Sequence, residues 1–88
     1  MKGKYDFVYS SRFEKEYKKL KKILDEEILL AINKFRHEEN HKQLKLHKLT
    51  GEFHEYYAFS VNYKYRIMIK FVGNEVHFVD IGNHDIYK

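Results

Sequence analysis

Side chains that can bind phosphate and move protons gather in the second half of this chain. Residues 44–88 carry histidines, an arginine and tyrosines among many lysines. Arginine and lysine bind phosphate oxygens, and histidine gains or loses a proton near neutral pH. This combination predicts chemistry on an RNA backbone, where one group takes a proton from the 2′-hydroxyl and another protonates the departing 5′-oxygen.

Arg66 is the first candidate, because it lies in a segment that alternates like a strand. Alternation puts Arg66, Met68 and Lys70 on one face of residues 65–72 and the apolar side chains on the other. A guanidinium on an open sheet face can fork onto phosphate oxygens and stabilise charge that grows on phosphorus. The alternative is a solvated surface arginine, or one that pairs with Asp80.

His84 and Tyr87 are the candidates near the C-terminus. They follow Gly82 and Asn83, which we expect to end the last strand. His84 could there act as acid or base, and Tyr87 could stack on a splayed base or donate its hydroxyl to the phosphate. The alternatives are a polar surface histidine and an aromatic ring that covers the core.

His47 lies in a lysine-rich segment, residues 44–49. A strand there would place Lys45 and His47 on one face, with Lys48 on the other face beside the leucines. Lys45 and His47 could then meet a phosphate together, with His47 as a further catalytic candidate. The alternative is an edge strand that lysines protect against aggregation. The candidate phosphate-binding residues are Lys45, Lys48, Lys64 and Lys70.

Two other histidine groups are incomplete as metal sites. His37 and His41 are four residues apart, and His54 lies beside Glu55. Neither pair has a third ligand at a characteristic spacing. We therefore expect no metal and no cofactor.

Composition predicts a single small globular domain in the cytoplasm. The chain has 88 residues, 43% of them hydrophobic, no cysteine, and no apolar run long enough for a membrane span or a secretory signal. Its net charge of +4 permits a polyanionic partner. The lysine-rich segment 15–22 has the spacing of an exposed helical face, which could be solvated or could hold ribosomal RNA.

The elements follow from the hydrophobic periodicity. A short strand at 5–9 precedes a helix that starts at Ser10 or Ser11, with Glu14 at a capping-box spacing from Ser11. Asp25 is the expected N-cap of a second helix that reaches about Glu39. An alternating segment at 44–49 leads into a turn at Thr50 and Gly51, and three strands are expected over 56–61, 65–72 and 75–81 as an antiparallel meander. The predicted class is α+β in the order β-α-α-β-β-β, a helical hairpin on one face of a small antiparallel sheet.

Three motifs resemble the RelE/ParE superfamily of small bacterial toxins. They are the Leu-x-Gly at 49–51, the Tyr-Arg-Ile at 65–67, and the Ile-Gly-x-His-Asp-x-Tyr at 81–87. The resemblance is nearest to the RelE, YoeB and YafQ branches, which cut messenger RNA. It implies the RelE-like fold over nearly the whole chain, although its specific motifs occupy only the second half.

The resemblance also implies a function and partners. The chain would be the toxin of a type II toxin–antitoxin system, a ribosome-dependent mRNA endoribonuclease that leaves a cyclic phosphate and needs no metal. Arg66 would stabilise the phosphorane, His84 would act as acid or base, and Tyr87 would orient the substrate. The implied partners are a cognate antitoxin, the ribosome and mRNA.

The chain departs from the family that it resembles at the general base. YoeB-like members carry a glutamate where this chain has Gln43, and YafQ-like members carry a histidine and an acidic residue where it has Ser60 and Lys64. The base is thus unassigned, with His47 first and a nearby lysine second. The alternative functions are a non-enzymatic ParE-like inhibitor of DNA gyrase, an inactive RelE homologue, or a general RNA-binding module.

Overall fold

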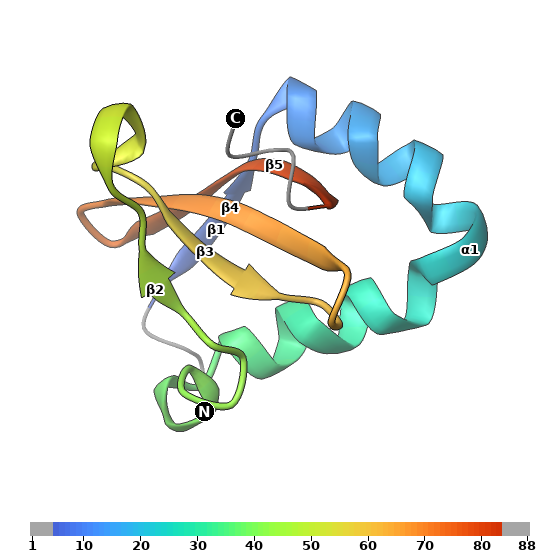
Figure 1. Cartoon of the computed structure of the whole chain (residues 1–88), viewed down its shortest axis with the longest axis horizontal. Coiled ribbons are helices and arrows are strands. Elements are labelled where there is room, and N and C mark those ends of the chain that lie inside the picture. The colour runs from blue at the N-terminus through green and yellow to red at the C-terminus, as the bar shows by residue number, and fades with distance from the viewer. Residues whose placement is uncertain (1–4, 84–88) are drawn as a thin grey trace.

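One bent helix covers one face of a five-stranded sheet (Figure 1). The structure is a computed structural model, and it describes residues 5–83. Its strands are β1 (Asp6–Tyr9), β2 (His47–Lys48), β3 (Tyr57–Ser60), β4 (Tyr65–Val72) and β5 (Glu75–Asn83), and its helices are α1 (Ser11–Phe35) and the 3-10 turns η1 (Glu38–Asn40) and η2 (Gly51–Phe53). The predicted α+β fold is confirmed.

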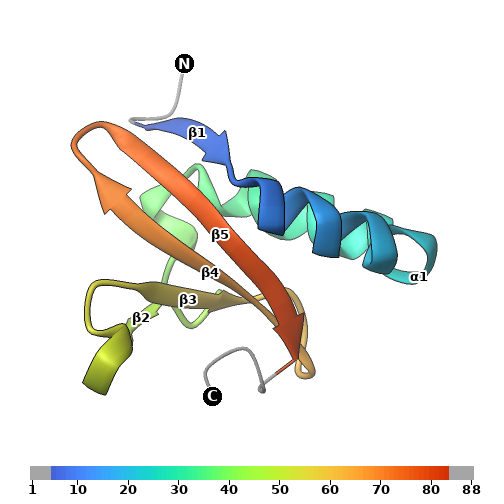
Figure 2. The same ribbon diagram turned by 90° about the horizontal axis from the view of Figure 1, so that it is seen from above.

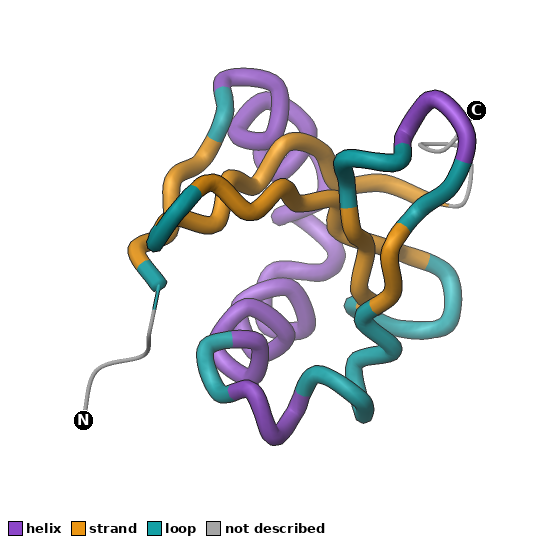
Figure 3. The backbone as a smooth tube through the Cα atoms, turned by 90° about the vertical axis from the view of Figure 1, so that its left-hand side faces the viewer, coloured by secondary structure: helices purple, strands orange, loops and turns teal. Residues whose placement is uncertain are grey.

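The strands run in the order β1-β5-β4-β3-β2. β3, β4 and β5 form the predicted antiparallel meander, and the short β2 adds an antiparallel edge strand. β1 pairs parallel with β5, which makes the sheet mixed. α1 and η2 lie on opposite sides of this sheet (Figures 2 and 3). We call the face opposite α1 the open face.

The predicted helical hairpin is present as two arms of α1. Leu24 leaves the helical conformation, with φ −128° and ψ 15°, and the arms fold back on each other there (Figure 1). Asp25 does not cap the second arm through its side chain as expected. Its Oδ1 instead accepts a hydrogen bond of 2.6 Å from the Tyr17 hydroxyl, which ties the second arm to the first.

The hydrogen bond between Tyr17 and Asp25 predicts how the free energy of unfolding changes at high pH. The hydrogen bond to Asp25, with burial and the carboxylate charge, raises the pKa of Tyr17 to about 12. A raised pKa contributes stability below the unfolded value near 10, and that contribution is lost as pH rises toward 12. We expect the free energy of unfolding of Tyr17→Phe to be about 1 kcal/mol lower than that of the wild type at pH 8. The difference should shrink above pH 10.

Urea unfolding of the wild type and Tyr17→Phe across pH 8–12 measures this difference. Tyr63→Phe is the matched control, because Tyr63 is 89% exposed. A destabilisation by Tyr17→Phe that stays constant over the whole pH range would contradict the role of the phenol proton.

The core lies between α1 and the sheet and is unusually aromatic. Phe35, Phe59 and Phe78 are fully buried, and the Phe35 and Phe59 rings stack with centroids 4.5 Å apart. Ile67 and Ile69 of β4 point into the same core. Arg66 therefore lies on the opposite face of β4 from the core residues Ile67 and Ile69, as predicted.

Several predicted boundaries are wrong. Of the two serines expected at the start of the helix, Ser10 caps α1 through its Oγ, which accepts from the Phe13 amide at 3.0 Å, so the predicted capping box between Ser11 and Glu14 does not form. The helix ends at Phe35 rather than near Glu39. The expected break at 82–83 is absent, because β4 supplies ladder partners for both residues.

The described part of the chain contains no helix with the length and apolar character of a membrane span.

Candidate functional site

The open face brings Arg66 and His47 onto one surface. Arg66 lies opposite Ser60 of β3 and Gly82 of β5. His47 lies opposite Ala58, which in turn pairs with Met68 on the open face. Their positions are thus two strand spacings apart across the sheet, about 10 Å, and two residues apart along the strand direction, about 7 Å.

The Arg66 guanidinium is held by one nitrogen only. Its Nη1 donates to the Asn62 carbonyl at 2.7 Å and to the Tyr65 carbonyl at 3.2 Å. Among the described residues, Nε and Nη2 have no partner. These two nitrogens form the edge that can fork onto a phosphate, so this edge remains available in an oriented side chain.

The turn that holds Arg66 is itself fixed by a side chain. Asn62 Oδ1 accepts from the backbone amides of Lys64 and Tyr65 at 2.9 and 2.8 Å, an Asx-type turn. Asn62 Nδ2 also donates to Glu27 of α1 at 3.3 Å. The carbonyl that anchors Arg66 is therefore connected to the helix layer.

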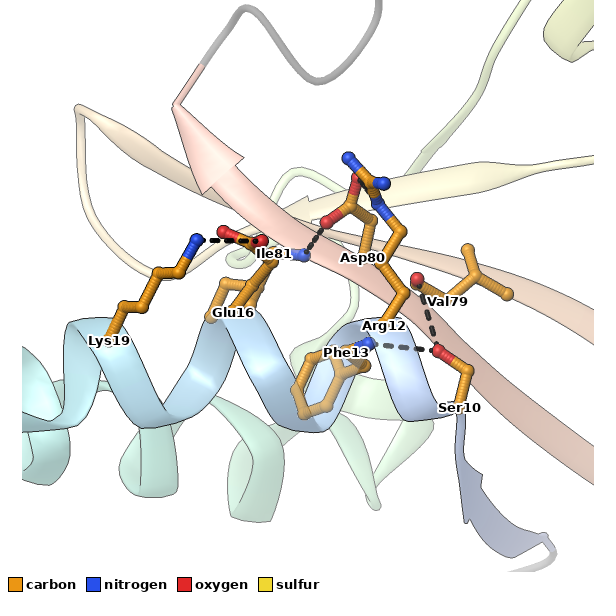
Figure 4. A network of polar contacts seen from close by, with 8 residues as sticks. All are labelled: Ser10, Arg12, Phe13, Glu16, Lys19, Val79, Asp80 and Ile81. Atoms are coloured by element: carbon orange, nitrogen blue, oxygen red, sulfur yellow. Dashed lines mark hydrogen bonds and ion pairs between the residues drawn. The ribbon is translucent and has the colours of Figure 1, made fainter.

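The alternative partner for Arg66 is engaged elsewhere. Asp80 is only 8% exposed, and its Oδ2 accepts from Arg12 Nε at 3.1 Å (Figure 4). Its Oδ1 accepts from the Ile81 amide at 2.8 Å. The Arg66–Asp80 pair considered from the sequence therefore does not form.

His47 is an exposed residue of the short edge strand β2, and its ring is oriented by the backbone. Nδ1 lies 2.9 Å from the carbonyl oxygen of Lys45. The other ring nitrogen, Nε2, has no partner among residues 5–83. His47 therefore presents a free nitrogen.

The four candidate lysines lie in different environments. Lys45 is not in a strand: it has φ 60° in the turn before β2, so the expectation that it shares a strand face with His47 is wrong. The reversal from η1 into β2 imposes this turn, which the Leu46 amide closes by donating to the His41 carbonyl at 3.0 Å. Lys48 is exposed on the opposite face of β2 from His47.

Lys64 and Lys70 each contact another side chain. Lys64 is exposed, with Nζ 5.4 Å from the centroid of the Tyr65 ring. Lys70 Nζ forms an ion pair with Glu55 at 3.3 Å. Lys70 is also four residues along β4 from Arg66, about 13 Å, so the two do not form one cluster.

A second hydrophobic cluster, which was not predicted from the sequence, separates Arg66 from Lys70. Leu49, Ala58 and Met68 are buried together on the open face, with Phe53 of η2 packed against them. The open face is thus polar at two ends and apolar between them. The alternation of Met68 with two basic residues in β4 was the available signal.

A network at the start of α1 was also missed. The β4–β5 ladder changes register between Met68 and Ile69, and Val79 has no pairing partner in β4. Ser10 Oγ donates to the Val79 carbonyl at 3.2 Å, beside the Arg12–Asp80 pair (Figure 4). Val79 is thus an extra residue in β5, a bulge, and it shifts by one residue the register in which β5 pairs with residues 65–68 of β4. An aspartate between Val79 and Ile81 in an apolar strand was the sequence signal.

A pocket of about 400 Å³ adjoins the end of β5. Among the described residues, Arg12 and Lys19 of α1 line it together with Tyr65, Gly82 and Asn83 of the sheet. Gly82 is the β5 residue that pairs with Arg66, so the pocket adjoins the strand position next to Arg66.

His84 and Tyr87 lie outside the described residues, so their predicted roles remain predictions. His41, considered with His37 as a metal pair, stacks on Phe35 at 4.4 Å and makes a 2.8 Å hydrogen bond to its carbonyl. The described residues contain no group of three or more potential histidine, cysteine or carboxylate metal ligands.

The comparisons with known proteins bear on the fold. The sequence matches no protein-family model and no curated protein. YafQ from E. coli strain BL21(DE3) matches in structure with a TM-score of 0.73 and 18% identity, over 94% of this chain and 97% of that chain. The chain has the fold of this protein.

Two further structures agree. A match in the E. coli DinJ–YafQ toxin–antitoxin complex has a TM-score of 0.74 and 19% identity, over 94% and 96% of the two chains. YoeB from Staphylococcus aureus, solved as a dimer, has 0.69 and 18%, over 92% and 98%. The RelE-like fold expected from the motifs is thus confirmed.

Proposed function

We propose that this chain is the toxin of a type II toxin–antitoxin system and that it cuts mRNA on the ribosome. The observation that carries the proposal is the oriented Arg66 guanidinium, whose Nε and Nη2 edge is unpartnered among the described residues. A toxin–antitoxin complex and a YoeB/ParE toxin of the same fold support it.

The proposed reaction needs only side chains and a 2′-hydroxyl. A base removes the 2′-hydroxyl proton, and the 2′-oxygen attacks the adjacent phosphorus. The bond to the 5′-oxygen then breaks, an acid protonates that oxygen, and a 2′,3′-cyclic phosphate remains. Arg66 neutralises charge on the phosphorane, and no metal is required.

His47 is the proposed base and His84 the proposed acid. His47 shares the open face with Arg66, and its Nε2 has no partner within residues 5–83. Lys70 fits the role less well, because it is paired with Glu55. Tyr87 is proposed to stack on a base or to orient the phosphate.

The ribosome is the proposed carrier of the substrate, and the first arm of α1 is the proposed contact with its RNA. Residues 11–23 contain six basic and two acidic residues, a net charge of +4, which equals the net charge of the whole chain. The described residues include no acidic partner for Lys15, Lys18, Lys21 or Lys22. Such a surface favours phosphate contacts that do not depend on sequence.

Removing two of these charges should weaken substrate capture. We expect Lys18→Gln with Lys22→Gln to raise KM for ribosome-bound mRNA about 10-fold at near-physiological salt, because each lost phosphate contact weakens binding. The change in kcat should be small. The matched control is Lys34→Gln with Lys42→Gln, which removes the same charge elsewhere. Equal effects of the two pairs would contradict a localised surface.

The proposed protein partner is an antitoxin. The DinJ–YafQ complex shows that a toxin of this fold binds an antitoxin. An acidic partner segment would complement the basic surfaces of this chain. Action on ribosomes would place the protein in the cytoplasm.

The test is cleavage of mRNA by the purified chain, with and without ribosomes, with mapped 5′ ends. Defined cuts that require ribosomes are the expected result. Intact mRNA at high protein concentration would reject the nuclease, and inhibition of DNA gyrase supercoiling by the same preparation would establish a ParE-like binder instead.

A further inference from the structure

Lys45 holds an unusual backbone conformation two residues before His47. Its φ of 60° makes it the one non-glycine residue with positive φ in the described part of the chain. Side chains other than glycine, asparagine and aspartate adopt this region at a cost, and such residues often occur at functional sites. The surrounding contacts maintain it: the Lys45 amide donates to the Lys42 carbonyl, and Leu44 is buried in the core.

The conformation turns the Lys45 carbonyl toward the His47 ring. The carbonyl oxygen lies 2.9 Å from His47 Nδ1. A carbonyl can only accept a hydrogen bond, so Nδ1 must carry the proton. In the neutral ring, the lone pair then lies on Nε2, which can accept a proton.

Two other histidines of the described residues are held in the opposite sense, whereas His54 resembles His47 in that its Nδ1 lies 3.1 Å from the Gly51 carbonyl oxygen. His41 and His77 make their hydrogen bonds through Nε2, to the Phe35 carbonyl and to Glu75 Oε1, both at 2.8 Å. Their neutral rings therefore carry the proton on Nε2. These two residues serve as internal references for His47.

We propose that the backbone of Lys45 is a positioning element that fixes the tautomer of His47 and presents Nε2 as the proton acceptor. This inference rests on the proposed function for its catalytic meaning. Its structural content is independent of cleavage. The role belongs to the Lys45 carbonyl, whereas the Lys45 ammonium acts separately on phosphate.

Long-range ¹H–¹⁵N correlation of the wild-type side chains at pH 8 tests the arrangement directly. The expected result is a protonated Nδ1 in neutral His47 and a protonated Nε2 in His41 and His77. A neutral His47 that carries its proton on Nε2 would overturn the inference, whether or not the chain cuts RNA.

Two substitutions separate the carbonyl from the ammonium. Lys45→Gly allows positive φ and removes the charge, whereas Lys45→Val removes the charge and disfavours positive φ. We expect Lys45→Gly, which has lost the contact of the ammonium with phosphate, to have a raised KM and to keep the Nδ1 proton. Lys45→Val should lose the tautomer preference and lower kcat about 10-fold or more, because base catalysis contributes at least that much.

Backbone amide spectra verify that both variants are folded. Equal kcat in folded Lys45→Gly and Lys45→Val would overturn the catalytic part of the inference. If the wild type cuts no RNA, the proposed function fails, while the tautomer measurement still decides the Lys45–His47 arrangement.

Discussion

Arg66→Ala is expected to reduce mRNA cleavage by about 10²–10³-fold, the loss typical of removing one preorganised donor to transition-state charge. The expected cause is the loss of the Nε and Nη2 edge, which is held toward the open face through the Asn62 and Tyr65 carbonyls. The effect should appear in kcat, because the charge on phosphorus grows only as the reaction proceeds.

Two variants make this result specific. Arg66→Lys keeps the charge and loses the fork, so it should recover only part of the rate. Arg36→Ala is the matched control: this arginine lies on the helix side of the sheet, 4.3 Å above the Phe7 ring, and its removal should leave kcat near the wild-type value. Full cleavage by folded Arg66→Ala would refute the role of the guanidinium.

Phe78→Ala is expected to lower the free energy of unfolding by about 3–5 kcal/mol, the usual cost of deleting a buried phenylalanine. Phe78 is fully buried at the centre of the aromatic core, with Phe7 and Tyr9 both 4.9 Å away between ring centroids and Phe13 at 5.5 Å. A cavity there would loosen β1, β5 and α1 together. In a domain this small, the loss is a large part of the total stability.

Urea unfolding followed by circular dichroism measures this change. Tyr63→Ala removes a ring that is 89% exposed and should change stability by less than about 0.5 kcal/mol. A loss below about 1 kcal/mol for Phe78→Ala would contradict the central place of this ring in the core.

Local periodicity was sufficient for much of the fold. The apolar and polar alternation of β4 placed Ile67 and Arg66 on opposite faces correctly. The helical spacing around Phe13 and Phe35 marked the side of α1 that packs on the sheet. These features follow from side-chain periods that act over a few residues.

Features set by distant contacts were not predictable in this way. The parallel pairing of β1 with β5 joins residues about 70 positions apart. The turn at Lys45 contains no glycine, so nothing in its residue types announces a positive φ. Asp80 was assigned no partner other than Arg66, because the bulge that brings it to Arg12 appears only when β4 and β5 pair.

The candidate site was predictable in its residue types but only partly in its geometry. Arg66 and His47 do share the open face. Lys70 is separated from Arg66 by the apolar cluster around Met68. Side-chain type shows what a residue could do, whereas the register of the strands decides which residues meet.

The chemical identity of the RNA ends tests the central claim most directly. Wild-type protein is incubated with ribosomes programmed with a defined mRNA, and the upstream fragment is analysed by mass spectrometry. A 2′,3′-cyclic phosphate at its 3′ end, absent from reactions with Arg66→Ala, is the predicted result. Fragments that end in a 3′-hydroxyl, or no fragments at all, would contradict a nuclease that uses the 2′-hydroxyl and Arg66.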